Sequence, residues 1–206
     1  GWETRRLYFD FARDAQGNFV EGTKLVKDVE QWREAPITRI ISFGDCNVAC
    51  PYCKRDCQFI DDSGTPIIST RVKARVVAAL CEGAVNRQET VRFSGGDPVV
   101  FPNLTLALAE YLWQNRGVKS SIAHNGSGPV WAKRMLPYLS SAAIDLKGSR
   151  DKIGKIMGIS PERGRTFYAH SLETQSIISR DGVALDVRTP FFGDTSIDEM
   201  RELAAD

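Results

Sequence analysis

The sequence predicts an α/β fold built around a parallel sheet. Predicted strands and helices alternate five times along the 206-residue chain, a pattern typical of strand–helix–strand units with right-handed crossovers. Every conspicuous polar stretch follows a predicted strand, and in parallel α/β folds the functional groups gather at the carboxyl ends of the strands. Alternation alone leaves open whether the sheet is open or forms part of a barrel.

Five segments carry the apolar, β-branched composition of buried strands. They are 37–43, 90–96, 118–126, 141–148 and 183–190. Residues 1–36 precede the first of them and are predicted to form an N-terminal appendage. Within it, 5–12 and 19–26 can pair as a β-hairpin around the turn at 14–18. Residues 37–206 are predicted to form a single domain.

Helical periodicity marks the segments that follow the strands. They are 71–84, 103–117, 129–139, 167–182 and 196–206. Gly117 ends the second of these helices, and Asp181-Gly182 leads from the fourth into the last strand. Ser196 is the expected N-cap of the final helix, and Glu199 would complete a capping box with it.

Composition excludes several classes of protein. Hydrophobic residues make up 42% and charged residues 26% of the chain, which is ordinary for a globular domain. The 27 basic and 26 acidic residues give a net charge of +1, which is no electrostatic signature for nucleic acid or an anionic membrane. No apolar run could span a bilayer, and the amino end lacks the apolar core of a secretory signal. We therefore expect a cytoplasmic protein without nucleic-acid or membrane partners.

Four of the five cysteines lie within twelve residues. Cys46, Cys50 and Cys53 have the spacing C-x3-C-x2-C, and Cys57 follows. Such clustering indicates a metal or redox site rather than a disulfide framework. A structural zinc site usually takes four ligands, commonly as two separated pairs. Three thiolates suit a [4Fe–4S] cluster in which one iron stays open for another ligand.

Two motifs together resemble the radical S-adenosylmethionine (radical SAM) superfamily. The first is the three-cysteine spacing with the aromatic Tyr52 just before the last cysteine. The second is the stretch Ser94–Pro98, which resembles the Gly-Gly-Glu-Pro turn of that family with Asp97 in place of Glu. The resemblance runs from about residue 37 to the end of the sequence. It implies a partial parallel (β/α)6-type barrel, of which the sixth strand is missing from this chain.

The resemblance also implies cofactors and chemistry. A [4Fe–4S] cluster on Cys46, Cys50 and Cys53 would bind S-adenosylmethionine (AdoMet) at its open iron. One electron from a donor such as flavodoxin or ferredoxin would cleave AdoMet to methionine and a 5′-deoxyadenosyl radical, which abstracts hydrogen from a substrate. A fourth thiolate would block AdoMet, so Cys57 is expected not to be a ligand. Cys81 is expected to pack in the core.

Further cofactor-binding residues follow from the resemblance. They are Tyr52, Gly95, Gly96, Asp97, Asn125, Asp145, Lys147 and Arg188. The Gly95–Gly96 turn would receive the methionine amine through backbone carbonyls, while Asp97 mainly holds the turn. A plain strand-to-helix turn would also explain the glycines, though not their position.

Three stretches are similar to the glycyl-radical activating enzymes, the subgroup of the pyruvate formate-lyase activating enzyme. In residues 123–126, Asn125 and Gly126 match the Asp-Thr-Asn-Gly of that subgroup, whereas Ala123 and His124 do not. His124 can be a cofactor or substrate contact or an ordinary hydrogen-bonded turn histidine. The Asp145/Lys147 and Asp186/Arg188 pairs each share a strand face and also match the subgroup. Arg188 is the better candidate for the cofactor carboxylate, and either pair can instead be a structural salt bridge.

Three functions are consistent with these features. The first is an activase that installs a glycyl radical on a partner enzyme. The second is a tailoring enzyme that rearranges, decarboxylates or dehydrogenates a small molecule such as a sugar, nucleoside or peptide. The third, from another class, is an iron–sulfur electron carrier, which would have no use for four motif turns around one site.

Overall fold

The structure is a computed structural model that describes residues 9–10, 24–25, 38–43, 46–53, 74–190, 192 and 195–205. Within the first 36 residues, the described strands are β1 (Phe9–Asp10) and β2 (Lys24–Leu25), which pair in antiparallel fashion. Most of the expected hairpin, and Cys57, lie outside the described residues.

The main sheet has five strands, all parallel to their neighbours. They are β3 (Thr38–Phe43), β4 (Thr90–Gly95), β5 (Ser120–His124), β6 (Leu139–Asp145) and β7 (Ala184–Arg188). Their spatial order is the order of the sequence, and the sheet does not close on itself. The α/β prediction is confirmed, because this sheet matches a partial (β/α) barrel without a sixth strand.

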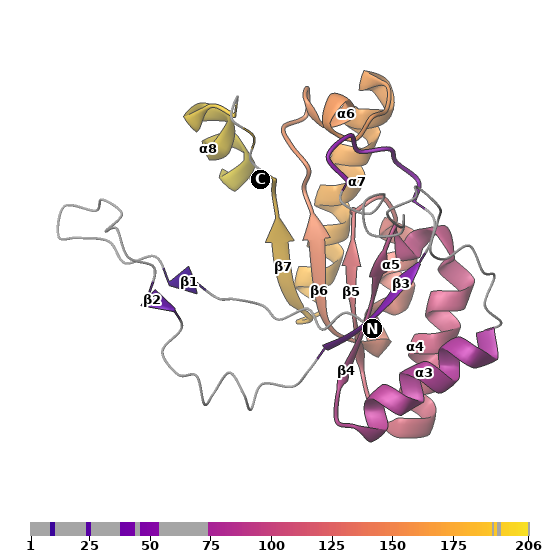
Figure 1. Ribbon diagram of the computed structural model, residues 1–206. Helices are drawn as coiled ribbons and strands as arrows, with labels where there is room; N and C mark the ends of the chain where they lie inside the picture. Colours follow the sequence, from indigo (N-terminus) through magenta and orange to yellow (C-terminus); the bar gives the residue numbers. More distant parts are fainter. Residues whose placement is uncertain are drawn as a thin grey trace, which may run out of the picture.

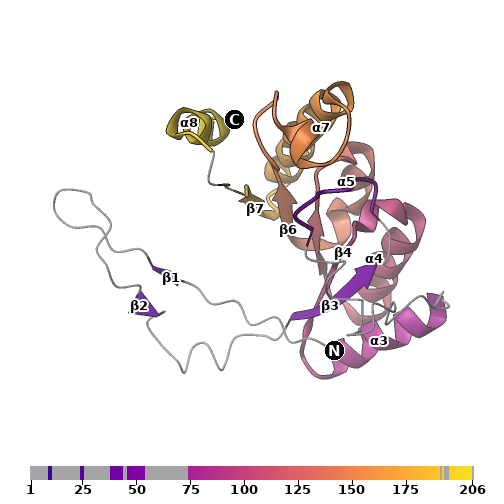
Figure 2. The ribbon, with the colours of Figure 1, turned by 45° about the horizontal axis from the view of Figure 1, so that its top comes forward.

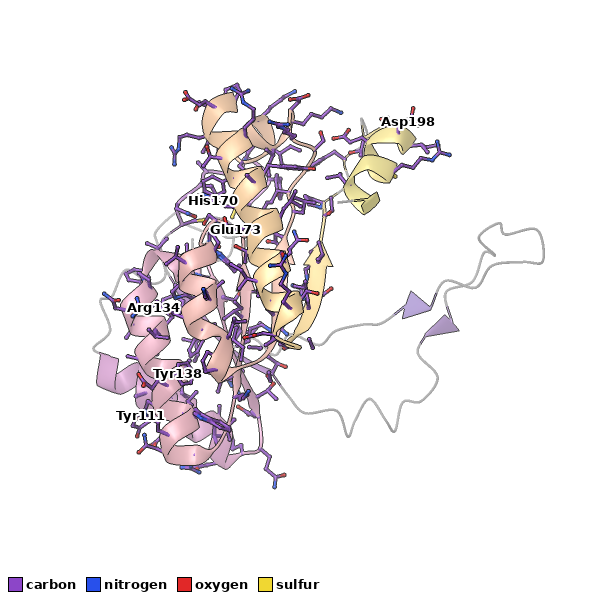
Figure 3. All side chains as sticks on the ribbon, turned by 180° about the vertical axis from the view of Figure 1, so that it is seen from behind. Tyr111, Arg134, Tyr138, His170, Glu173 and Asp198 are labelled. Carbon is purple, nitrogen blue, oxygen red and sulfur yellow. The ribbon has the colours of Figure 1, made fainter. Side chains whose placement is uncertain are left out.

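Helices cover one face of the sheet. The helices are α3 (Ala74–Asn86), α4 (Pro102–Arg116), α5 (Pro129–Met135), α6 (Ile153–Ile156), α7 (Pro161–Arg180) and α8 (Ile197–Ala205), with 3-10 turns η1 (Pro98–Val100) and η2 (Leu136–Tyr138). Figures 1 and 3 show α3, α4, α5 and α7 on the same side of the strands. In the described part of the chain, no helix has both the length and the apolar character needed to cross a membrane.

The main core lies between the sheet and these helices. Val91 and Phe93 of β4 and Ile122 of β5 are 0% exposed and pack with Leu112 of α4. Strand side chains alternate between the two faces, so these residues fix which face of each strand the helices cover. Burial of a side chain as large as Phe93 contributes about 3 kcal/mol.

A second, smaller core lies at the carboxyl end of the sheet. Leu146, Ile153, Met157, Phe167 and Tyr168 form it, and Val48 and Cys50 pack against it. The loop 46–53 is therefore seated on the α6–α7 region, as Figure 2 shows.

The opposite, amino-terminal edge of the sheet is held by an ion cluster. The buried Glu89 accepts hydrogen bonds from Arg39 of β3, at 2.9 and 3.0 Å, and from Arg87, at 3.0 Å. Hydrogen bonds first from Arg39 and then from Arg87 lower the pKa of Glu89 to about 2.

Two helix predictions need correction. Helix α7 begins at Pro161, six residues before the expected start, because Ser160 caps it by accepting from the Arg163 amide and Pro161 occupies its first turn. At α8, Ser196 accepts from the Glu199 amide at 3.1 Å, as predicted. The Glu199 side chain does not complete the capping box, since its oxygens accept from Ser149 at 3.0 Å and Lys152 at 2.5 Å.

Candidate active site

The predicted site residues lie at or just beyond the carboxyl ends of the five strands. The cysteine loop follows β3, the Gly95–Asp97 turn ends β4, and Asn125 follows β5. Asp145 ends β6 with Lys147 two residues beyond, and Arg188 ends β7. Parallel strands bring these ends to one edge of the sheet, so residues up to 142 positions apart in sequence can share a site.

The loop 46–53 carries the thiol groups of Cys46, Cys50 and Cys53, and a short turn shapes it. The Cys53 amide donates to the Cys50 carbonyl at 3.0 Å, which folds the second and third cysteines back toward each other. Just before Cys50, the Ala49 amide donates to the Met157 carbonyl at 3.0 Å. Gly158, at φ +66°, lies so close to Ala49 that any side chain there would collide with the Ala49 carbonyl.

Burial controls the ionisation of the loop side chains. Desolvation raises the pKa of the half-buried Cys50 thiol, and the nearby Lys147 ammonium opposes that shift. The pKa of the Tyr52 phenol is also raised, first by burial and then by the charge of Cys50. Since thiolates are the form that binds metal, Lys147 favours the state of Cys50 that ligation requires.

The turn after β4 needs glycine. Gly95 has φ +107°, and a Cβ at this position would collide with the backbone of Phe43 on the neighbouring strand. The Gly96 amide donates to the Phe43 carbonyl at 2.8 Å, which fastens the turn to the start of the cysteine loop. The backbone of this turn is therefore closely packed and fixed.

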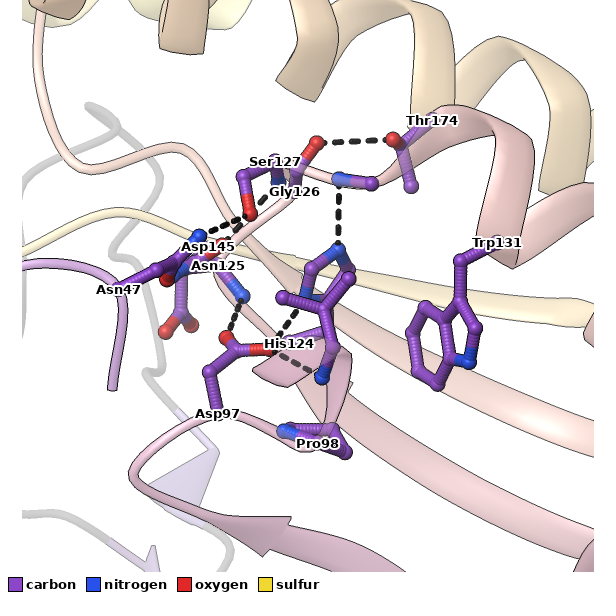
Figure 4. Close-up of polar contacts among 12 residues, drawn as sticks. Asn47, Asp97, Pro98, His124, Asn125, Gly126, Ser127, Trp131, Asp145 and Thr174 are labelled. Carbon is purple, nitrogen blue, oxygen red and sulfur yellow. Dashed lines mark hydrogen bonds and ion pairs between the residues drawn. The ribbon is translucent and has the colours of Figure 1, made fainter. Parts of the chain in front are cut away.

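Asp97 joins this turn to the next one (Figure 4). The Asp97 carboxylate is 2% exposed and accepts from the amides of Val99 at 2.9 Å and Asn125 at 2.8 Å. It also lies 2.7 Å from His124 Nδ1. With three donors from the protein on its two oxygens, Asp97 holds the turn.

His124 is buried beneath the same two turns. Its Nε2 accepts from the Gly128 amide at 3.2 Å, which assigns the ring proton to Nδ1, where it faces Asp97. Its ring packs edge-on against Trp131, with centroids 5.1 Å apart. Of the two interpretations of His124, the structure shows the hydrogen-bonded turn histidine. The other histidine, His170, lies on α7 on the helical side of the sheet (Figure 3).

Two asparagines connect the cysteine loop to the turn after β5 (Figure 4). Asn125 donates from its side chain to the Asn47 side-chain oxygen at 2.7 Å, and Asn47 donates to Ser127 Oγ at 2.9 Å. The Ser127 amide donates to Asn125 Oδ1 at 3.1 Å. Asn47, Asn125 and Asp97 thus form a continuous series of hydrogen bonds from the first motif to the second.

Helix α7 supports the turn after β5 from behind. Thr174 donates to the Gly126 carbonyl at 2.8 Å. Gly126 has φ +83°, and a Cβ there would lie 2.5 Å from Ser171 Oγ. The close approach of helix and turn requires glycine at this position.

Asp145 and Lys147 form an ion pair, with 2.6 Å between Lys147 Nζ and Asp145 Oδ2. Lys147 Nζ also lies 5.9 Å from the ring centroid of Tyr52, which brings the end of β6 to the cysteine loop. The Tyr52 hydroxyl is buried and has no hydrogen-bond partner among the described residues. A buried hydroxyl in this state provides a polar contact for a ligand.

Arg188 lies beside Asp145 in the strand register but pairs with a residue of its own strand. Its Nε and Nη2 donate to Asp186 Oδ2 at 2.9 and 2.8 Å. The side chains of Arg188 and Asp186 are 39% and 52% exposed, so a ligand could exchange for this pair at little cost.

Some residues of the site were not predicted from the sequence. Asn47 and Ser127 were not among the predicted site residues, although Asn47 directly follows Cys46. Gly158 and Thr174 gave no local signal, because their partners Ala49 and Gly126 lie far away in sequence.

The residues of the loop suit an iron–sulfur cluster. Three cysteine thiols lie on one loop, beside a glycine turn with room only for backbone. The buried Tyr52 hydroxyl nearby has no hydrogen-bond partner in the described part of the chain. Among the described residues, no three His, Cys, Asp or Glu side chains converge on the position of a single metal ion. A [4Fe–4S] cluster needs one thiolate for each iron that the protein binds.

Comparison with known proteins shows a family and a fold. Residues 40–171 match the model of the Radical SAM superfamily. Native anSMEcpe with bound AdoMet is similar in structure, with a TM-score of 0.50, 16% identity, and coverage of 73% of this chain and 43% of that chain. Histidine-tagged anSMEcpe with bound AdoMet has a TM-score of 0.50 and 16% identity, with coverage of 74% of this chain and 42% of that chain. The chain thus spans less than half the length of these structures. No curated protein matches the chain.

Proposed function

The chain belongs to the radical SAM superfamily, whose cofactors are a [4Fe–4S] cluster and AdoMet, and we propose that Cys46, Cys50 and Cys53 hold that cluster for reductive cleavage of AdoMet. One observation carries the proposal. The hydrogen-bond series from Asn47 through Asn125 to Asp97 places the three-cysteine loop against the Gly95–Gly96 turn. The proposed cluster ligands and the proposed backbone surface for the cofactor would thereby lie side by side.

The bound cofactors would supply one chemical step. Held by Cys46, Cys50 and Cys53, the cluster would supply one electron for cleavage of a carbon–sulfur bond of the AdoMet sulfonium, and the resulting 5′-deoxyadenosyl radical would take a hydrogen atom from the substrate. A one-electron donor such as flavodoxin or ferredoxin would restore the electron.

The residues of this chain bind and orient the cofactors. The carbonyl groups of the Gly95–Gly96 turn are fixed in position to accept hydrogen bonds from the methionine amine. Lys147 and Arg188 are the cations at the ends of β6 and β7 that can bind the methionine carboxylate, and Arg188 offers two parallel N–H groups. Asp145 can accept from the ribose, and Tyr52 can offer its buried hydroxyl. Asp97 positions the turn rather than touching the cofactor.

The experiment is anaerobic reconstitution of the chain with iron and sulfide, followed by dithionite and AdoMet. Release of 5′-deoxyadenosine and methionine is the expected result, and Cys50→Ala should abolish it. Cys81→Ala is the matched control, because Cys81 is buried in the main core away from the loop and should leave release unchanged. If the wild type carries a full cluster and still releases no 5′-deoxyadenosine, the proposal is wrong. Release by Cys50→Ala at the wild-type rate would also contradict it.

Two classes of substrate are candidates. The Asp145/Lys147 and Asp186/Arg188 stretches favour an activase that acts on a glycyl-radical enzyme. A specific feature of the structure, the sheet face that none of the described helices covers, favours a small molecule that binds on that face. A radical signal on a candidate partner protein would support the first class, and a chemically altered small molecule would support the second.

A further inference from the structure

One face of the sheet carries no helix in the described part of the chain (Figures 1 and 3). On β4, Val91 and Phe93 point into the helical core, so Arg92 and Ser94 between and beyond them point to the other face. Parallel partners in register face the same way, so Ile40 of β3 and Ser121 of β5 lie on either side of Arg92 on that face.

Apart from Ile40, the surroundings of Arg92 are small and mostly polar. Thr90, Ser94, Ser121, Ala123 and Ser141 share its face by alternation and register. These side chains are short, and most of them offer hydroxyl groups. A large apolar substrate would find little to pack against here, whereas a polar one would find donors.

Arg92 differs in position from the other charged residues of this face. Asp145 with Lys147 and Asp186 with Arg188 are ion pairs at the carboxyl edge, at 2.6 and 2.8 Å. Arg92 lies three residues before Gly95, which corresponds to about 10 Å along an extended strand. A molecule the size of one amino acid, sugar or nucleoside can bridge that distance.

The guanidinium of Arg92 is held by its neighbouring strand. Its Nε donates to Ser121 Oγ at 3.1 Å. This bond limits rotation of the planar group, and an oriented guanidinium is suited to bind two oxygens of a carboxylate or phosphate.

We propose that Arg92 anchors the carboxylate or phosphate group of a small-molecule substrate on the uncovered sheet face. The rest of that substrate then extends toward the Gly95–Gly96 turn, where its reacting carbon meets the radical. The reaction of the substrate with the radical rests on the proposed function, whereas the anion-binding site at Arg92 does not. The proposed substrate class is a small anionic molecule rather than a partner protein.

The test measures anion binding to the reconstituted protein with AdoMet present and no reductant, so that no cleavage occurs. Inorganic phosphate and acetate are titrated separately by calorimetry, and the anion that depends more strongly on Arg92 identifies the group. Arg92→Gln should weaken binding of that anion at least tenfold. Arg92→Lys, which keeps the charge but loses the planar fork, should weaken it about threefold. Ser121→Ala should cause a similarly small loss.

Arg180→Gln is the matched control, because Arg180 is an exposed arginine at the end of α7. It should bind both anions as the wild type does. Unchanged binding in Arg92→Gln, or no binding by the wild type, would overturn the proposal. If Arg92→Gln unfolds, Arg92→Lys decides the question. Failure of both variants to fold would assign Arg92 to the structure and overturn the proposal as well.

This test is separable from that of the proposed function. Loss of anion binding in Arg92→Gln, with 5′-deoxyadenosine release intact, would support both proposals. Binding that depends on Arg92 in a protein that releases no 5′-deoxyadenosine would refute only the radical chemistry.

Discussion

His124 Nδ1 lies 2.7 Å from Asp97 Oδ1, and this bond joins the turn after β4 to the turn after β5. Both groups are buried, with side chains 0% and 2% exposed. His124 also accepts from the Gly128 amide, so its ring spans two turns of the candidate site. The position of the Gly95–Gly96 backbone therefore depends on a side chain that faces the helices and does not reach the uncovered face.

Replacing His124 should lower both the stability of the fold and the affinity for AdoMet. His124→Ala leaves the buried Asp97 carboxylate and Gly128 amide each short of a partner, which should lower the free energy of unfolding by about 2 kcal/mol. We expect the dissociation constant for AdoMet to rise roughly tenfold, equivalent to about 1.4 kcal/mol. Both can be measured on the reconstituted protein, by chemical denaturation and by equilibrium binding.

Two further variants separate positioning from stability. His124→Asn keeps an N–H for Asp97 and should restore much of the AdoMet affinity. His170→Ala removes the other histidine, on α7, and should leave the affinity unchanged. AdoMet binding by His124→Ala at wild-type strength would show that the two turns are held without His124.

Gly158→Ala should loosen the cysteine loop. The new methyl group would collide with the Ala49 carbonyl, which belongs to the loop between Cys46 and Cys50. Gly182→Ala is the matched control, because Gly182 has a similar φ of +70° and a methyl group there would meet nothing within 4 Å. Both variants carry the backbone strain of about 1 kcal/mol, but only Gly158→Ala should also lower the iron content after reconstitution. Equal iron content in the two variants would refute the proposed contact.

The five cysteines should fall into two groups by their effect on iron content. Alanine at position 46, 50 or 53 should abolish the visible absorption of the cluster, since each thiolate binds its own iron. Alanine at position 57 or 81 should leave about four irons per chain, as expected for an intact [4Fe–4S] cluster. Loss of the cluster in Cys57→Ala would identify Cys57 as a fourth ligand and would leave no iron for AdoMet.

The Glu89 ion cluster should make stability depend on pH in the acid range. Its pKa in the folded protein is about 2, below the ordinary 4.5. A carboxyl group with a lowered pKa stabilises the fold above its unfolded pKa, and that contribution is lost as the pH falls through the folded value. The stability difference between wild type and Glu89→Gln should therefore be constant above about pH 5 and decline toward pH 2. Urea unfolding at several pH values measures it, and a difference that grows on acidification would contradict the assignment.

The sheet could be predicted closely from the sequence because its strands are short apolar runs between clear turn residues. For example, 37–43 was expected and Thr38–Phe43 was found. Helix α6 was missed because its four residues, Ile153–Ile156, are too few to show a helical period. The early start of α7 could have been predicted, since Ser160 and Pro161 form a standard helix beginning.

The candidate site was predictable in its motifs but not in its connections. The cysteines, the Gly95–Gly96 turn and Asn125 each have a local pattern that marks them. Their links to one another join residues distant in sequence, such as Asn47 with Asn125, and arise only when parallel strands align. The role of His124 depends on Asp97, 27 positions away, so a single sequence leaves that role open.

The Glu89 cluster and the cysteine loop lie at opposite ends of the same strands. Glu89 and Gly95 are six residues apart on an extended chain, which is about 20 Å. Effects of substitutions at such a distance usually add without coupling. Substitutions in the charged cluster at one end could therefore change how long the folded protein persists without changing which molecules bind at the other end.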